Sequence, residues 1–91
     1  ITSADSLTEG DFYNIVSGSG AVTVTLPGNS GLTDGTIFYI KRGYGMTNNV
    51  TVTVADVNAE MIDGDSSIVL ESALAAVQVF WDSTAGNWAV F

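Results

Sequence analysis

The chain has 91 residues, the size of one small domain. It contains no cysteine and no histidine, which excludes disulfides, thiolate metal sites and catalysis by a histidine-containing triad. Ten acidic residues face two basic ones, for a formal net charge of −8, so nucleic-acid phosphates and anionic lipid heads would repel the chain. The sequence also lacks an apolar run of the roughly 18–20 residues that spans a bilayer. We therefore expect no nucleic-acid partner and no membrane insertion.

Apolar and polar residues alternate with a period of two in the first half of the chain, the pattern of half-buried β-strands. In Gly20–Gly28, Val22 and Val24 fall on one face, and Pro27 ends the strand because proline cannot donate to a ladder. The strands predicted here are Asp11–Ser17, Gly20–Gly28, Thr36–Arg42 and Val50–Ala55. Thr36–Arg42 is apolar on both faces near its middle, which predicts a strand covered on both sides.

The second half adds strand-like runs at Met61–Ile62, Ile68–Leu70, Ala76–Asp82 and Asn87–Phe91. Glu71–Gln78 is the one helical candidate, and we expect it to hold no more than one turn. Turn residues (Gly, Asn and Asp) separate the runs. This spacing predicts one all-β domain over residues 1–91, a small antiparallel β-sandwich or jelly-roll-like barrel of about 7–8 short strands.

The chain carries more apolar residues than a domain of this size readily buries. Hydrophobic residues make up 46% of the sequence and charged residues 13%. Surplus apolar surface usually marks a partner or an oligomer interface, and small domains without disulfides or metals often need oligomerisation. The first residue is Ile1 and not a methionine, so we expect a piece of a longer chain.

The stretch "EMIDGDSSIVL" raises the question of a metal loop. Counted from Asp63 in the EF-hand pattern, Asp65 and Ser67 fall on ligand positions, but Ile68 stands where glycine is required and Leu74 where a bidentate glutamate is required. A β-turn that Asp63 starts, with Gly64 at the strained backbone angle, is favoured over a calcium loop. A weak calcium site at Asp63 and Asp65, completed by another chain, stays open as the alternative.

No pair of carboxylates singles itself out as catalytic. The acidic residues in or beside predicted loops are Asp5, Glu9, Asp34, Asp56, Asp63, Asp65 and Asp82. Solvated carboxylates belong in loops in any case, and a glycosidase needs two of them across a sugar-binding cleft. We therefore expect no enzyme activity, no catalytic residue and no cofactor.

The loop "GYGMTNN" offers a candidate contact for a glycan or receptor. Tyr44 stands between two glycines, where a ring would be exposed, and sugars stack on aromatic rings. Thr47, Asn48 and Asn49 could read the hydroxyl groups. The alternative is that Tyr44 packs over a strand end or against a neighbouring subunit. This alternative is favoured, because a single aromatic residue on a loop is weak evidence for a glycan site. Trp81 and Trp88 lie in apolar strands and are expected in the core or in an interface.

Four features together resemble a known family. They are a Val/Thr strand ending at Leu26–Pro27, the strand Gly35–Arg42, the corner Ile62–Gly64 and the final hairpin Asp82–Trp88. In this order, over most of Ile15–Phe91, they resemble the small β domains of bacteriophage tail fibres and tailspikes.

This resemblance implies a sandwich or jelly-roll-like domain that trimerises at or near the tip of a host-recognition fibre, in the virion. It implies a homotrimer that supports attachment to a host surface glycan or receptor, and it carries over no catalytic residue. The strong acidity of the chain is a departure from this family, because a net charge of −8 would repel an anionic lipopolysaccharide. The alternative function is a monomeric carbohydrate-binding module of a secreted or cell-surface protein.

Overall fold

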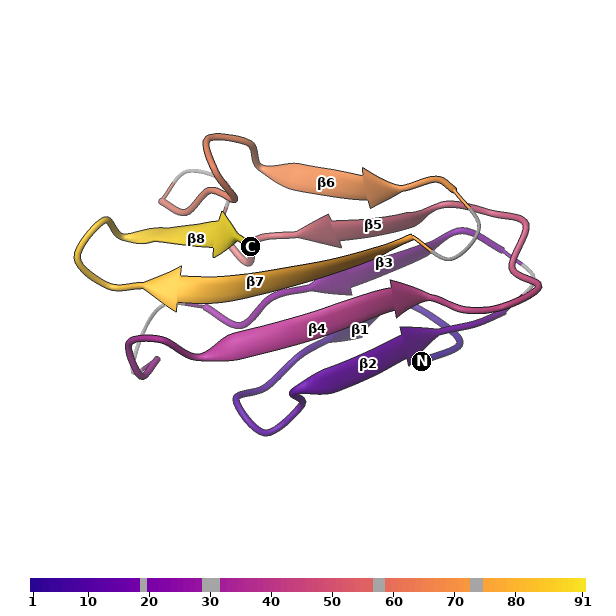
Figure 1. Cartoon of the computed structure of the whole chain (residues 1–91), viewed down its shortest axis with the longest axis horizontal. Coiled ribbons are helices and arrows are strands. Elements are labelled where there is room, and N and C mark those ends of the chain that lie inside the picture. The colour runs from indigo at the N-terminus through magenta and orange to yellow at the C-terminus, as the bar shows by residue number, and fades with distance from the viewer. Residues whose placement is uncertain (19, 29–31, 57–58, 73–74) are drawn as a thin grey trace.

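The computed structural model describes residues 1–18, 20–28, 32–56, 59–72 and 75–91, and two four-stranded sheets pack face to face in it (Figure 1). Sheet A contains, in spatial order, β1 (Asp5–Ser6), β3 (Val22–Thr25), β5 (Val50–Thr53) and β6 (Ser67–Leu70). Sheet B contains β2 (Tyr13–Val16), β4 (Ile37–Arg42), β7 (Ala76–Asp82) and β8 (Asn87–Val90). The predicted small β-sandwich is confirmed.

No described residue is helical. Of the helical candidate Glu71–Gln78, residues 73–74 lie outside the described part, and its last three residues begin β7. The described residues accordingly hold no helix long and apolar enough to cross a membrane.

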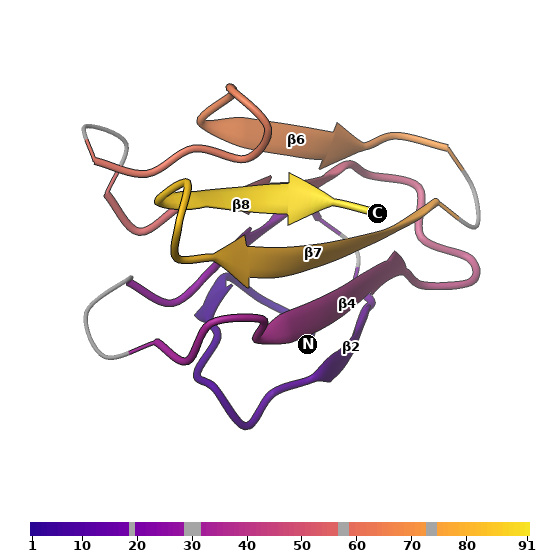
Figure 2. The same ribbon diagram turned by 60° about the vertical axis from the view of Figure 1, so that its left-hand side comes forward.

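Strand pairing is mixed, whereas the sequence predicted an antiparallel sandwich. β4–β7, β5–β6 and β7–β8 are antiparallel, but β1–β3, β2–β4 and β3–β5 are parallel. The reason is the path of the chain, since the first five strands alternate between the two sheets (Figures 1 and 2). Each crossing reverses direction, so strands two apart in sequence share both a sheet and a direction. Hairpin pairing between sequence neighbours starts only at β5.

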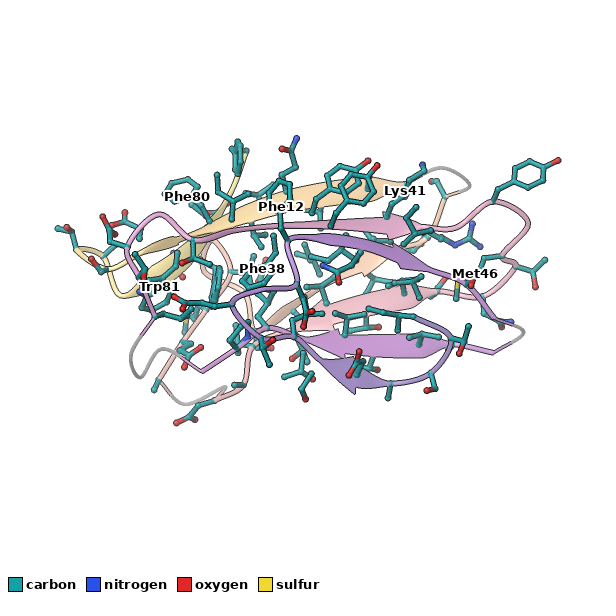
Figure 3. All side chains as sticks on the ribbon, turned by 90° about the horizontal axis from the view of Figure 1, so that it is seen from below. Phe12, Phe38, Lys41, Met46, Phe80 and Trp81 are labelled. Atoms are coloured by element: carbon teal, nitrogen blue, oxygen red, sulfur yellow. The ribbon has the colours of Figure 1, made fainter. Side chains whose placement is uncertain are left out.

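The core lies between the sheets and follows the predicted alternation. Inward-facing residues of both sheets are buried, and Phe38, Met46 and Trp81 project into this layer in Figure 3. The fully buried side chains include Val16, Val24, Leu26, Phe38, Ile40, Val50, Val52, Ile62, Val79 and Trp88. Each buried side chain of this kind contributes about 1.5–3 kcal/mol. Trp81 and Trp88 were expected in the core or in an interface, and they lie in the core, with ring centroids 5.3 Å apart.

β4 departs from its prediction as a strand covered twice. Phe38 and Ile40 are buried, but Tyr39 on the other face is half-buried and Ile37 is 37% exposed. Within the described residues, no further layer covers this side of sheet B (Figure 2). The apolar residues on both faces therefore mark a sheet whose outer side is open within one subunit.

Candidate functional site

The outer face of sheet B is the first candidate surface. Alternation along the four strands and the residue that follows β8 sets its members, which are Tyr13, Ile15, Ile37, Tyr39, Lys41, Ala76, Gln78, Phe80, Asp82, Asn87, Ala89 and Phe91. Phe80 and Lys41 project from this side in Figure 3, away from Phe38. Tyr13 and Phe91 are more than half exposed. One broad face of the sandwich is therefore mainly apolar and aromatic.

Aromatic pairs order this outer face. Tyr13 and Tyr39 are directly paired on the parallel strands β2 and β4, and their rings stack at 4.7 Å between centroids and 19° between planes. Phe80 and Phe91 meet edge to face at 5.6 Å. Such pairs contribute about 0.5–1.5 kcal/mol beyond the area that they bury. The side chains of the face thus hold one another in place before any partner arrives.

The acidic residues are segregated from the middle of this face. Eight of the ten acids lie on the loops that follow β1, β3 and β5 or at the end of β7: Glu9, Asp11, Asp34, Asp56, Glu60, Asp63, Asp65 and Asp82. Strand directions bring all of these positions to one end of the molecule, here called the acidic end (Figure 1). Asp82 turns its carboxylate to the N–H groups of Thr84 and Ala85, at 3.1 and 3.2 Å. The charged residues of the outer face of sheet B are Lys41 and, where β7 reaches the acidic end, Asp82.

Two carboxylates of the acidic end hold loops together. Glu9 Oε1 accepts a hydrogen bond from the N–H of Thr33 at 2.7 Å, and this bond lowers the pKa of the Glu9 carboxyl below its ordinary value. Asp34 Oδ1 accepts from the N–H and the hydroxyl of Ser83 at 2.8 and 2.9 Å, and the N–H is the main cause of the lowered pKa of Asp34. The geometry gives both groups a structural role, as acceptors between loops distant in sequence.

Asp63 is also engaged in the fold, at a tight turn. Ile62 and Asp65 exchange backbone hydrogen bonds of 2.6 and 3.0 Å, and Asp63 and Gly64 between them have φ of 47° and 93°. Two central residues at positive φ define a two-residue hairpin turn of type I′. The predicted turn is confirmed, except that Asp63 is its first central residue and shares the positive φ with Gly64. Among the described residues, no three His, Cys, Asp or Glu side chains gather as metal ligands.

The loop at 43–49 is the second candidate surface, and it lies at the opposite end from most of the acids (Figure 1). Tyr44 is 94% exposed, so its ring does not pack over a strand end of its own subunit. Below it, Arg42 is buried and its Nε donates to the carbonyl of Asn48 at 2.9 Å, while Met46 is buried in the core. These anchors fix the base of the loop, and Gly45 at φ of 80° forms the turn with Tyr44 at the tip.

The four predicted contact residues thus come together on one anchored loop. Thr47 and Asn49 are exposed and Asn48 is half-buried. The carbonyls of Asn48 and Asn49 are used inside the fold, by Arg42 and by the N–H of Val22. These two bonds tie the end of the loop to the rest of the fold.

Two clefts of about 350 and 320 Å³ lie at the acidic end. Leu7, Glu9, Pro27 and Leu32 line part of the first, and Glu60, Met61 and Asn87 line part of the second. Tyr44 lines neither of these clefts, and its almost complete exposure shows that its ring protrudes from the surface.

Sequence reasoning did not identify the outer face of sheet B. The signal is the presence of apolar residues at both parities in "FYNIV", "TIFYIK" and "VQVFW". Such a strand is either covered on both sides or open on one, and only the tertiary structure separates the two cases.

No protein-family model matches the chain, and a comparison with curated proteins finds no significant match.

Proposed function

We propose that this chain is a structural domain of a bacteriophage tail fibre or tailspike, which assembles as a homotrimer and supports attachment to the host cell. The observation that carries the proposal is the outer face of sheet B. A mainly apolar face with preordered rings, one basic residue and one acid at its end has the composition of an interface core. In the proposed trimer the three outer faces meet around the three-fold axis.

The dimensions of the domain are compatible with such an interface. Its principal extents are 38, 24 and 21 Å, so a broad face is of the order of the roughly 800 Å² that each partner contributes to a standard interface. Charge favours the same face, because copies that each carry −8 approach most easily on a face whose middle carries no acid and whose one acid, Asp82, lies at its end. A second copy of the chain is therefore the occupant that the charge distribution favours.

The Tyr44 loop supports the attachment role. An exposed ring on an anchored loop loses little conformational freedom on binding, which is the property of a contact residue. In the proposed fibre, three such loops lie at one end of the trimer, opposite the acidic ends. The function is then adhesive and structural and not enzymatic, and its place is the virion.

The molar mass in solution tests the trimer. Light scattering after size exclusion at tens of micromolar should give three times the single-chain mass of 9.5 kDa. Ile37→Glu on the outer face of sheet B should shift the mass toward 9.5 kDa, because the interface would bury three unpaired carboxylates. Val69→Glu is the matched control, since Val69 is 44% exposed but lies on the outer side of sheet A. A single-chain mass for the unaltered protein, or the same mass for both variants, would sink the trimer.

A carbohydrate-binding module is the second candidate, and the exposure of Tyr44 favours it equally. It differs in predicting a monomer that binds glycans. The outer face of sheet B suits a sugar less well, because the stacked rings of Tyr13 and Tyr39 cover one face of each other. A glycan array separates the candidates when it is combined with the mass measurement. Tyr44→Ala should abolish any glycan signal and leave the mass unchanged, and a signal that survives this change would remove the loop from the site.

A further inference from the structure

The first residue of the chain lies on the outer edge of β2, the strand that ends sheet B. The amino group of Ile1 donates to the carbonyl of Ile15 at 2.9 Å, and the carbonyl of Ile1 accepts from the N–H of Ser17 at 2.7 Å. In a parallel bridge, a residue donates to the residue before its partner and accepts from the residue after its partner. Ile15 and Ser17 are the two neighbours of Val16, so Ile1 forms a parallel bridge with Val16. Ile1 therefore runs beside β2 in the same direction as β4 does on the other side.

Among the residues that the structure describes, no strand pairs with the outer edge of β2 ahead of this bridge. The carbonyls of Phe12 and Val16 accept hydrogen bonds from Tyr39 and Gly43, so the even-numbered residues of the strand direct their backbone groups toward β4. Alternation then directs the N–H and carbonyl of Tyr13 and the N–H of Ile15 to the outer edge. The segment "FYNIV" contains no proline and no charged residue, which are two of the devices that protect edge strands from pairing.

The path of the chain points to what would pair there. From β1 to β5 the chain alternates between the sheets, and β1 and β2 are both parallel to their neighbours (Figures 1 and 2). By the same alternation, a strand ahead of β1 would lie in sheet B, beside β2. Ile1 already lies in that position.

We propose that the outer edge of β2 is a strand-addition site, which backbone attached ahead of Ile1 would occupy in parallel register. A segment attached in this way would enter the domain as a continuation of the backbone ladder and not as a flexible linker. A second copy fits less well, because a two-fold axis would pair β2 with β2 in antiparallel register. The site is independent of the proposed trimer, whose interface is the outer face of the sheet and not its edge.

Extension of the chain by a defined number of residues ahead of Ile1 tests the site. In a parallel ladder the residue two places before Ile1 accepts from the N–H of Ile15, and the residue four places before it accepts from the N–H of Tyr13. Amide hydrogen exchange, followed by NMR, should therefore slow at least tenfold at Ile15 with the extension Thr-Val. With Thr-Val-Thr-Val it should also slow at Tyr13. The amide of Val69 on the free edge of β6 is the internal control and should not change.

Two further results decide the proposal. Thr-Val-Pro-Val places proline two residues before Ile1, where a donor to the carbonyl of Tyr13 is needed, and should abolish the protection of both amides. Fast exchange at Tyr13 and Ile15 in the four-residue extension would overturn the proposal. Protection that appears only at high protein concentration would overturn it too, because a second copy would then occupy the edge. Neither result bears on the mass that tests the trimer.

Discussion

The carboxylate of Asp63 accepts a hydrogen bond from the backbone N–H of Val90 at 2.9 Å, across the gap between the turn 62–65 and the edge strand β8. Backbone bonds continue this contact, because the N–H of Trp88 donates to Met61 and the N–H of Asp63 donates to the carbonyl of Trp88. The turn leads into β6 of sheet A, so these bonds join the two sheets on the side of β6 and β8. They also cover an edge that would otherwise be open to pairing.

Replacement of Asp63 should destabilise the domain through this contact. Asp63→Ala loses the acceptor for Val90 and places a β-carbon without a compensating side-chain bond at positive φ, for an expected cost of about 1–3 kcal/mol. Asp63→Gly loses the same hydrogen bond but has no strain at positive φ, so its loss of stability measures the hydrogen bond alone. Urea unfolding followed by tryptophan fluorescence measures both. Asp65→Ala in the same turn is the control, and an equal loss there would contradict the role of the Asp63 carboxylate.

Gly43 should resist any side chain, for a reason other than its backbone angle. A β-carbon at this position would lie 2.5 Å from the carbonyl oxygen of Val16, to which the N–H of Gly43 also donates a hydrogen bond. Gly43→Ala should therefore cost about 1–3 kcal/mol, as overpacking does elsewhere. Thermal unfolding measures the change. Gly10→Ala meets no atom within 4 Å and should be near neutral. Equal melting temperatures for the two variants would refute the steric argument.

Acid should weaken the loop contacts made by Glu9 and Asp34. Both have a pKa lowered by hydrogen bonds in the folded state, from ordinary values of 4.5 and 3.8. A lowered pKa means that the folded state binds fewer protons than the unfolded state. The stabilisation is therefore complete above the ordinary value and is lost as the pH falls through the lowered one.

Glu9→Gln and Asp34→Asn test this linkage. Each variant should lose more stability at pH 7 than at pH 3, so its difference from the unaltered protein should shrink as the pH falls. Melting temperatures measured from pH 7 to pH 3 give this difference and remove the general effect of discharging the other acids. A difference independent of pH would show that these two carboxylates are not coupled to folding.

Salt should strengthen the proposed trimer. If its axis runs along the strands, three acidic ends lie together, and their repulsion is screened as the Debye length falls from about 10 Å at 0.1 M salt to about 3 Å at 1 M. The concentration for half assembly, measured by sedimentation, should therefore fall as sodium chloride rises. Neutralising Asp56 and Asp65 together, as Asp56→Asn and Asp65→Asn, should flatten this dependence. An assembly that weakens with salt would argue for a different arrangement of the subunits.

Local patterns predicted most of the strands but not their partners. The alternation in Gly20–Gly28 and Val50–Ala55 placed Val22, Val24, Val50 and Val52 on the buried side correctly. Nothing in these segments says that β3 and β5 are parallel neighbours, because that follows from the crossings of the whole chain. The candidate loop was also found from sequence, through "GYG", whereas its support by Arg42 and Met46 was not.

The sequence by itself determined the strand period, the core side of β3 and β5 and the Asp-Gly turn, because the pleat and the turn angles depend only on neighbouring residues. The tertiary structure decided three other things: the parallel pairing of alternate strands, the open aromatic side of sheet B and the free edge beside Ile1. Each of these depends on which distant segments meet. A residue such as Tyr39 is equally apolar in sequence whether a second layer covers it or not, so only the packing of the whole chain shows that its side remains open.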